Sequence, residues 1–154
     1  MNKFWKLPPR IKILEALGAI ADGRIKIISD EKKEKRIVKA ICLSSNRDKT
    51  YNITYIPEDN SITSDDNGSK FKGYLGYPSI ALLMIEKKLD FDIDLANSLA
   101  GIPWKKLNEK FKNYYLTEIE IKKILKNKGI NEEKIDNFIE IVLKQIKEKK
   151  FKKI

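Results

Sequence analysis

Histidine is absent from this sequence of 154 residues, and cysteine occurs once, as Cys42. Without His, the chain cannot build a Ser-His-Asp or Cys-His nucleophile, a His-based acid–base catalyst or a His-containing metal site. A single cysteine cannot form a disulfide within the chain, which is typical of proteins from a reducing compartment. The sequence therefore predicts a protein that is not an enzyme and that uses no cofactor and no metal.

Long apolar runs are also missing. The two longest, at 16–21 and 80–85, are far shorter than the roughly 20 residues of a membrane-spanning helix. The first ten residues lack the apolar core of a signal peptide, because Pro8 and Pro9 interrupt them. No segment combines a lysine face with a wide apolar face free of acids, as a helix on a membrane surface would. We expect a cytoplasmic protein without a membrane partner.

Positive charge is what the sequence has in excess. Lys and Arg number 32 against 22 Asp and Glu, for a net charge of +10 at pH 7. Most of these cations are Lys, and Lys, Ile and Asn all have A/T-rich codons, so codon bias alone explains a basic chain. The abundance of Lys, Glu and Ile and the single Gln145 are also typical of heat-adapted proteins. The other interpretation is an electrostatic footprint for nucleic acid.

Hydrophobic periodicity predicts an α+β fold: an N-terminal helix, an antiparallel meander of three or four strands, and a set of packed helices ending in a helical hairpin. Short polar connections between the strands favour antiparallel pairing over crossovers. The expected helices cover 8–22, 78–88, 94–100, 104–114, 117–129 and 131–150, and the expected strands cover 24–29, 36–44 and 50–56, with a weaker fourth strand at 61–64 or 70–74.

The helices carry recognisable start signals. Asp94 and Asn131 are expected N-caps, and Thr117 with Glu120 has the spacing of a capping box. The last expected helix has an apolar seam in 4-3-4 spacing, at Ile135, Ile139, Val142 and Ile146. We therefore expect two units, an α+β domain at 1–115 that binds nucleic acid and a C-terminal hairpin with a basic tail at 116–154. The hairpin would make the protein a homo-oligomer, a dimer or a tetramer.

One candidate binding surface is the sheet. In the strand at 50–56, Tyr51, Ile53 and Tyr55 fall on one face, and Arg24 and Lys26 stand on another strand. Bases of single-stranded nucleic acid stack on aromatic rings at about 1–3 kcal/mol each, while cations neutralise phosphates. The alternative is that the tyrosines are ordinary strand residues that close the edge of a core.

A second candidate is the loop at 70–78, where cations, aromatics and glycines alternate before a helix N-terminus that suits a phosphate. It is not a Walker loop, and the alternative is a tight turn with aromatic packing. A third is the segment at 3–10, whose aromatics could pack on the core, cover an interface or stack on bases. The candidate stacking residues are Trp5, Tyr51, Tyr55, Tyr74 and Tyr77, and the candidate phosphate contacts are Arg10, Arg24, Lys26, Lys70 and Lys72.

Two other functions stay open from the residues alone. A structural or adaptor protein would use the C-terminal hairpin to bind another protein, and its lysines would be a solvated surface. A metal-dependent nuclease would need distant Asp and Glu side chains to meet. The run at 90–94 has three alternating Asp residues but lacks the glycine and distal glutamate of a calcium loop.

Four stretches resemble the archaeal ThermoDBP-type single-stranded DNA-binding domain and its related proteins. They are Leu7-Pro8-Pro9-Arg10, the helix from Glu15 to Arg24, Gly73-Tyr74-Leu75-Gly76-Tyr77-Pro78, and Gly101-Ile102-Pro103-Trp104. The resemblance covers roughly residues 1–115. It implies a cleft that binds single strands with little sequence preference, and self-association through elements outside the common domain. We expect single-stranded DNA or RNA as the partner, with DNA favoured. The resemblance assigns no individual contact residue. We expect no small-molecule substrate.

Overall fold

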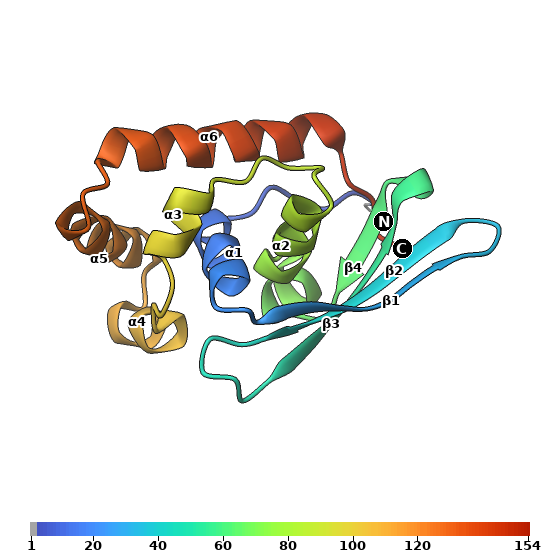
Figure 1. Ribbon diagram of the computed structural model, residues 1–154, viewed down its shortest axis with the longest axis horizontal. Coiled ribbons are helices and arrows are strands. Elements are labelled where there is room, and N and C mark those ends of the chain that lie inside the picture. Colours follow the sequence, from blue (N-terminus) through green and yellow to red (C-terminus); the bar gives the residue numbers. More distant parts are fainter. Residues whose placement is uncertain (1–2) are drawn as a thin grey trace.

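The structure is a computed structural model that describes residues 3–154. A four-stranded antiparallel sheet lies against α1 and α2, and the other helices extend from that pair (Figure 1). The elements in chain order are α1 (Ile11–Ala21), β1 (Ile25–Lys32), β2 (Arg36–Leu43), β3 (Thr50–Ile56), the 3₁₀ turn η1 (Pro57–Asp59), β4 (Ser61–Ser64), the π-helical turn η2 (Gly68–Lys72), α2 (Tyr77–Ile85), α3 (Ile93–Ser98), α4 (Trp104–Phe111), α5 (Tyr114–Asn127) and α6 (Glu132–Lys149). The expected α+β class is confirmed.

The sheet is a meander in the order β1-β2-β3-β4, as the short connections predicted. The weak fourth strand forms at 61–64, while the alternative at 70–74 falls largely in η2. Pairing places Ala40 opposite Ile53 and Tyr55 opposite Ile62, and all four side chains are buried. These residues form the inner face of the sheet, which α2 covers.

The opposite, outer face of the sheet is open to solvent. Lys26, Lys39 and Asn52 are exposed at positions that alternate with buried residues. A bulge between Ile27 and Ser29 shifts the register and leaves Ile28 exposed. Both tyrosines of β3 therefore belong to the covered face, and the expectation of aromatics on an open sheet face is wrong.

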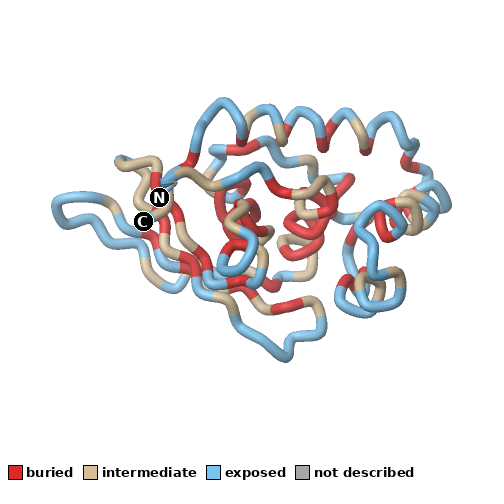
Figure 2. The backbone as a smooth tube through the Cα atoms, turned by 180° about the vertical axis from the view of Figure 1, so that it is seen from behind, coloured by how far each residue is buried: buried red, intermediate tan, exposed pale blue. Residues whose placement is uncertain are grey.

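Burial is concentrated in α1, α2 and the strands beneath them (Figure 2). The sequence of α1 is apolar almost all round, which suits its position among α2, α3, α5 and α6. Gly23 follows the helix with a φ of +66°, a left-handed conformation that favours glycine and turns the chain directly into β1.

Two of the expected helix starts are wrong by a few residues. Asp92, not Asp94, caps α3 by accepting a hydrogen bond from the backbone N–H of Leu95. Asn113 caps α5 in the same way, so Thr117 lies inside the helix, where its hydroxyl donates to the Asn113 carbonyl. In both cases the structure uses an Asp or Asn slightly upstream of the expected cap. Asn131 caps α6 as expected.

The helices after residue 115 pack on the rest of the chain. The expected boundary at 116 falls in the first turn of α5, and the seam of α6 at Ile135, Ile139, Val142 and Ile146 is buried in the same apolar cluster as α1. After α6, Phe151 is buried and Lys152 pairs with Phe4 and Ser61. The two described ends of the chain thus meet beside β4 (Figure 1), and the tail is held there rather than fraying.

An ion network ties this hairpin to α1. Arg10 contacts Glu118 at 3.2 Å and Asp136 at 2.6 Å, and Lys122 contacts the same two carboxylates at 3.1 and 2.8 Å. The carboxylates raise the pKa of Arg10 against the opposing effect of burial. Arg10, expected to contact phosphate, is therefore engaged in joining α1 to α5 and α6.

Candidate functional site

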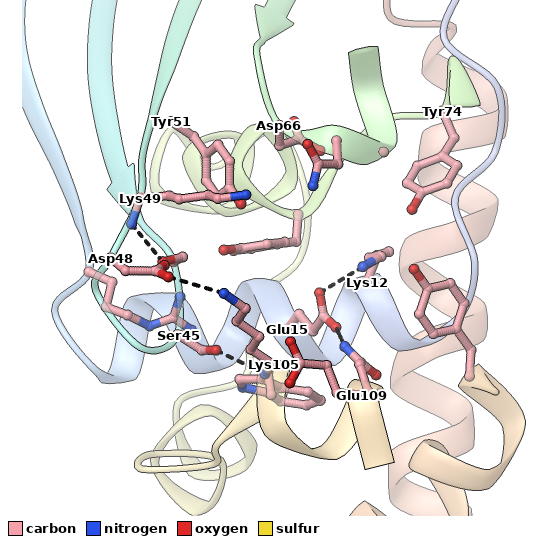
Figure 3. Close-up of a pocket in the computed structure, with 18 of the residues that line it drawn as sticks. Lys12, Glu15, Ser45, Asp48, Lys49, Tyr51, Asp66, Tyr74, Lys105 and Glu109 are labelled. Carbon is pink, nitrogen blue, oxygen red and sulfur yellow. Dashed lines mark hydrogen bonds and ion pairs between the residues drawn. The ribbon is translucent and has the colours of Figure 1, made fainter. Parts of the chain in front are cut away.

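A cavity of about 500 Å³ opens between α1, α4, the ends of β2 and β3, and the segment from Asp66 to Tyr77. Figure 3 shows Tyr51 and Tyr74 on opposite sides of this cavity, with Lys12 and Glu15 of α1 below Tyr74. Lys105 of α4 reaches in from the remaining side (Figure 3). Side chains that are far apart in the sequence therefore converge on one concave site.

A buried ion pair lies on the α1 side of the cavity. Lys12 Nζ donates to Glu15 Oε2 at 3.0 Å, and Glu15 Oε1 accepts from Asn108 Nδ2 at 2.9 Å. The side chains of Lys12 and Glu15 are only 12% and 4% exposed. Burial opposes the ammonium, but the Glu15 carboxylate outweighs burial, so the pKa of Lys12 is raised. Lys12 is therefore a fixed positive charge in the wall.

Aromatic rings surround this charge. Lys12 Nζ lies 4.8 Å from the centroid of the Tyr114 ring and 6.0 Å from that of Tyr77. Arg24 Cζ lies 5.8 Å from the Tyr77 centroid, and Tyr51 meets Tyr77 edge-on at 6.3 Å. Distances of this size are those of cation–π and T-shaped ring contacts. The rings and cations thus hold one another in place.

The segment that carries Tyr74 is organised by a buried carboxylate. Asp66 accepts hydrogen bonds from the hydroxyls of Ser64 and Ser69, the latter at 2.7 Å, and Ser69 Oγ in turn accepts from the Gly76 N–H. Asp66 packs so closely on Gly76, just before α2, that a Cβ there would lie 2.1 Å from a carboxylate oxygen. The start of α2 already faces this internal carboxylate, which competes with a phosphate for that helix end.

Close packing also places Tyr74. A Cβ on Gly68 would lie within 2.6 Å of three atoms of the Tyr74 side chain, so only glycine allows this contact. Burial raises the pKa of Tyr51, Tyr74 and Tyr77. All three phenols therefore stay protonated at neutral pH and present O–H donors as well as ring surface.

The more exposed edge of the cavity carries further cations. Lys105 Nζ pairs with Asp48 at 3.0 Å, and Lys49, Lys112 and Glu109 are also part of the lining. Within residues 3–154, neither Lys49 nor Lys112 has a carboxylate within 4 Å. These two exposed lysines form what we call the rim cations.

Three buried polar atoms have no hydrogen-bond partner among the described residues, and all three belong to residues that line this cavity. They are Arg24 Nη2, Trp104 Nε1 and Asn108 Oδ1. The Trp104 atom lies against Gly18 of α1, where a Cβ would be 2.8 Å away. Buried polar groups elsewhere are normally paired, so the protein tolerates unsatisfied hydrogen bonding specifically around this cavity.

Of the ten expected contact residues, the structure brings four to the cavity: Arg24, Tyr51, Tyr74 and Tyr77. Lys70 and Lys72 are exposed on η2 and do not line it, and Lys26 stands on the outer sheet face. Tyr55 is 1% exposed, so its ring cannot stack on a base.

Trp5 also lies elsewhere. Its indole N–H donates to the Ile62 carbonyl at 2.6 Å, and Lys153 Nζ lies 5.0 Å from its ring. Trp5 therefore fastens the N-terminal segment to β4 and the chain end. Of the three interpretations of the segment at 3–10, packing on the core fits Trp5 best.

Sequence reasoning missed Lys12, Glu15, Lys49, Asn108 and Tyr114. A usable signal existed for the first two, because they are the only charged residues of the otherwise apolar helix α1 and stand three residues apart. Such spacing allows an ion pair on one helix face. The other three come from distant segments, and only the tertiary fold brings them to α1.

Carboxylates do not gather into a metal site in the described part of the chain, where no three His, Cys, Asp or Glu side chains could hold an ion. None of the helices in residues 3–154 combines the length and apolar character needed to cross a membrane. A second, shallower cavity of about 400 Å³ lies beside α6, between Asp92 and Ile141.

Comparison with known proteins gives one match. The family model described as Uncharacterised conserved protein UCP014422 matches residues 5–152. Curated proteins and solved structures give no match. Because the model covers nearly the whole chain, the protein belongs to this family.

Proposed function

We propose that this member of the Uncharacterised conserved protein UCP014422 family binds single-stranded nucleic acid, without catalysis, through the aromatic and basic cavity. The observation that carries the proposal is the convergence of Tyr51, Tyr74 and Tyr77 with Lys12 and Lys49 on one concave site. Rings to stack on and cations near the phosphates are what a sequence-tolerant single-strand site needs. If the excess of lysine came only from codon bias, the lysines would be spread over the surface and would not lie beside clustered aromatic rings.

Each part of the cavity has a role in this proposal. The rings of Tyr51 and Tyr74, on opposite sides, supply the stacking surface (Figure 3). The rim cations supply phosphate contacts, and their side chains are free to follow the strand. The resemblance of residues 1–115 to the archaeal ThermoDBP-type domain supports DNA as the favoured strand. It also supports homo-oligomerisation as a dimer or tetramer, but the seam of α6 is buried within this chain and so does not supply the interface.

The competing adaptor function has less support from the geometry. An adaptor hairpin would need an apolar face to offer a partner, yet the seam of α6 is buried within this chain. We also propose a cytoplasmic location, supported by the single cysteine, which is buried and unpaired.

The test is a fluorescence anisotropy titration of labelled oligo-dT, oligo-U and a DNA duplex, each at two salt concentrations. The proposal predicts that single strands bind more tightly than the duplex and that their affinity falls as salt rises. Equal, weak and strongly salt-sensitive binding to all three would mean that the lysines act only as a non-specific basic surface. That result would overturn the proposal.

A further inference from the structure

The cavity is a half-open pocket that several separate segments of the chain line. Its lining comes from α1, the β2–β3 connection, the segment from Asp66 to Tyr77, α4 and the start of α5. Its volume of about 500 Å³ falls in the range of about 300–1,000 Å³ that is typical of small-ligand sites. A protein that stacks a run of bases presents an extended surface instead. The space between Tyr51 and Tyr74 suits one flat ring system with its substituents.

Charge is divided between the inside and the rim of this space. Inside, the acids Glu15 and Asp66 are only 3% and 4% exposed. Glu15 is paired with Lys12 at 3.0 Å, and the other interior cation, Arg24, is paired with Asp22 at 3.4 Å. Among the described residues, the inside of the cavity therefore has no unpaired cation to offer a phosphate. At the edge, Lys49 and Lys112 are exposed and have no carboxylate within 4 Å among residues 3–154. A ligand with an anionic end therefore fits with that end at the rim cations.

The interior also offers hydrogen bonds to a polar ring. The protonated hydroxyls of Tyr51 and Tyr74 are donors, and the carboxylate of Glu15 is an acceptor. A nucleobase, which carries ring donors and acceptors around a flat face, matches this lining better than a plain hydrocarbon ring would.

We infer that the cavity takes a single nucleotide, with its base between Tyr51 and Tyr74 and its phosphate at Lys49 and Lys112. The inference rests on the proposed function, and it narrows the site to one nucleotide unit of a strand. The rest of the strand would then lie outside the cavity and add only salt-sensitive contacts with surface lysines. A free mononucleotide has the same chemistry, so the experiment must distinguish a nucleotide within a strand from a free nucleotide.

Competition against a labelled oligo-dT strand tests the inference, with dTMP, thymidine and inorganic phosphate as separate competitors. We expect dTMP to displace the strand completely and roughly tenfold or more better than thymidine, because only dTMP adds a charge-assisted contact. Inorganic phosphate at the same concentrations should displace nothing, because it lacks the base. A direct titration of dTMP by calorimetry should give one site per chain.

The outcomes separate the inference from the proposed function. If the strand binds but saturating dTMP leaves it in place, the inference is overturned and single-strand binding stands. If dTMP binds and no strand does, the one-nucleotide site is supported, its source is the free nucleotide, and the proposed function fails. If neither binds, both fail.

A matched pair of variants locates the site. Lys49→Glu and Lys39→Glu make the same charge change, the first at the rim and the second on the outer sheet face. Both positions are exposed, and thermal unfolding checks that both variants fold. The inference predicts a loss of dTMP affinity of about tenfold for Lys49→Glu and no loss for Lys39→Glu. Equal losses in the two variants would place the nucleotide elsewhere and overturn it.

Discussion

The two faces of the sheet both carry lysine, but they differ in what surrounds it. On the outer face, Lys26 and Lys39 stand in solvent with no aromatic ring among the strand residues beside them. At the end of the inner face, cations lie within 6 Å of tyrosine rings and next to buried carboxylates. Net charge alone therefore says little about function in this chain, and the neighbours of each cation say much more.

The largest difference between the faces should appear in thiol reactivity. Cys42 points to the inner face, and burial raises its pKa to about 12 from a usual 9.0. At pH 8 the thiolate fraction should therefore be about a thousandfold below that of an open thiol. In a Lys39→Cys variant, the new outer-face thiol should react with a thiol reagent at an ordinary rate while Cys42 stays unlabelled. Fast labelling of Cys42 in the folded protein would contradict the register of β2.

The same pKa shift has a consequence for stability. Folding keeps the Cys42 thiol neutral, so its contribution is complete below pH 9 and declines as pH rises toward 12. A Cys42→Ala variant should lose this part of the pH dependence, measured by chemical unfolding across that range.

The buried ion pair gives the next largest effect. A Glu15→Leu variant leaves the Lys12 ammonium unpaired in the wall and removes the acceptor of Asn108. Removing one partner of a buried pair costs about 3–5 kcal/mol of unfolding free energy. A Lys39→Gln change on the outer face should cost under about 0.5 kcal/mol. Urea unfolding measures both, and the double variant Lys12→Met with Glu15→Leu should recover much of the loss. A Glu15→Leu cost below about 1 kcal/mol would mean that the pair is solvated.

Stacking provides a third comparison. Tyr74→Ala should weaken oligo-dT binding by about 1–3 kcal/mol, because it removes one wall of the cavity. Tyr55→Phe changes the buried tyrosine that shares the inner sheet face with Tyr51, and it should leave affinity unchanged in the folded protein. Anisotropy titrations measure both. Normal binding by a folded Tyr74→Ala protein would remove that ring from the site.

The smallest effect concerns single phosphate contacts. Lys49→Gln should lower the slope of log affinity against log salt by about 0.7, the value for one contact on a single strand. Lys39→Gln should leave the slope unchanged, although it removes the same charge. Equal slopes for the two variants would mean that phosphates do not distinguish the rim from the outer face.

The comparison also explains what the sequence could predict. Period-2 and helical patterns located the strands and helices because burial on one face imposes those periods on the residues themselves. The same pattern put Tyr51 and Tyr55 on one face, but it could not say that helices cover that face. Tyr51 lines the cavity because it lies where the helices stop covering the sheet, whereas Tyr55 is buried under them.

Site residues were harder to predict because their partners are distant in sequence. Arg10 looked like a phosphate contact, and only the fold reveals that Glu118 and Asp136 reach it from α5 and α6. The run from Asp65 to Gly68 has the composition of an ordinary turn, yet Asp66 lies buried against the start of α2. Long-range contacts of this kind leave no trace in local spacing.

The most direct test of the central claim is photocrosslinking of a strand that carries 5-iododeoxyuridine, followed by mass spectrometry of the linked peptides. The account predicts crosslinks at Tyr51 and Tyr74, which line the cavity, and loss of them when excess unlabelled oligo-dT is added. Phe71 and Tyr115 are far more exposed, at 70% and 71%, and would be the first aromatics met by a strand that binds the surface at random. Crosslinks confined to those two residues would contradict the claim that a base enters the cavity.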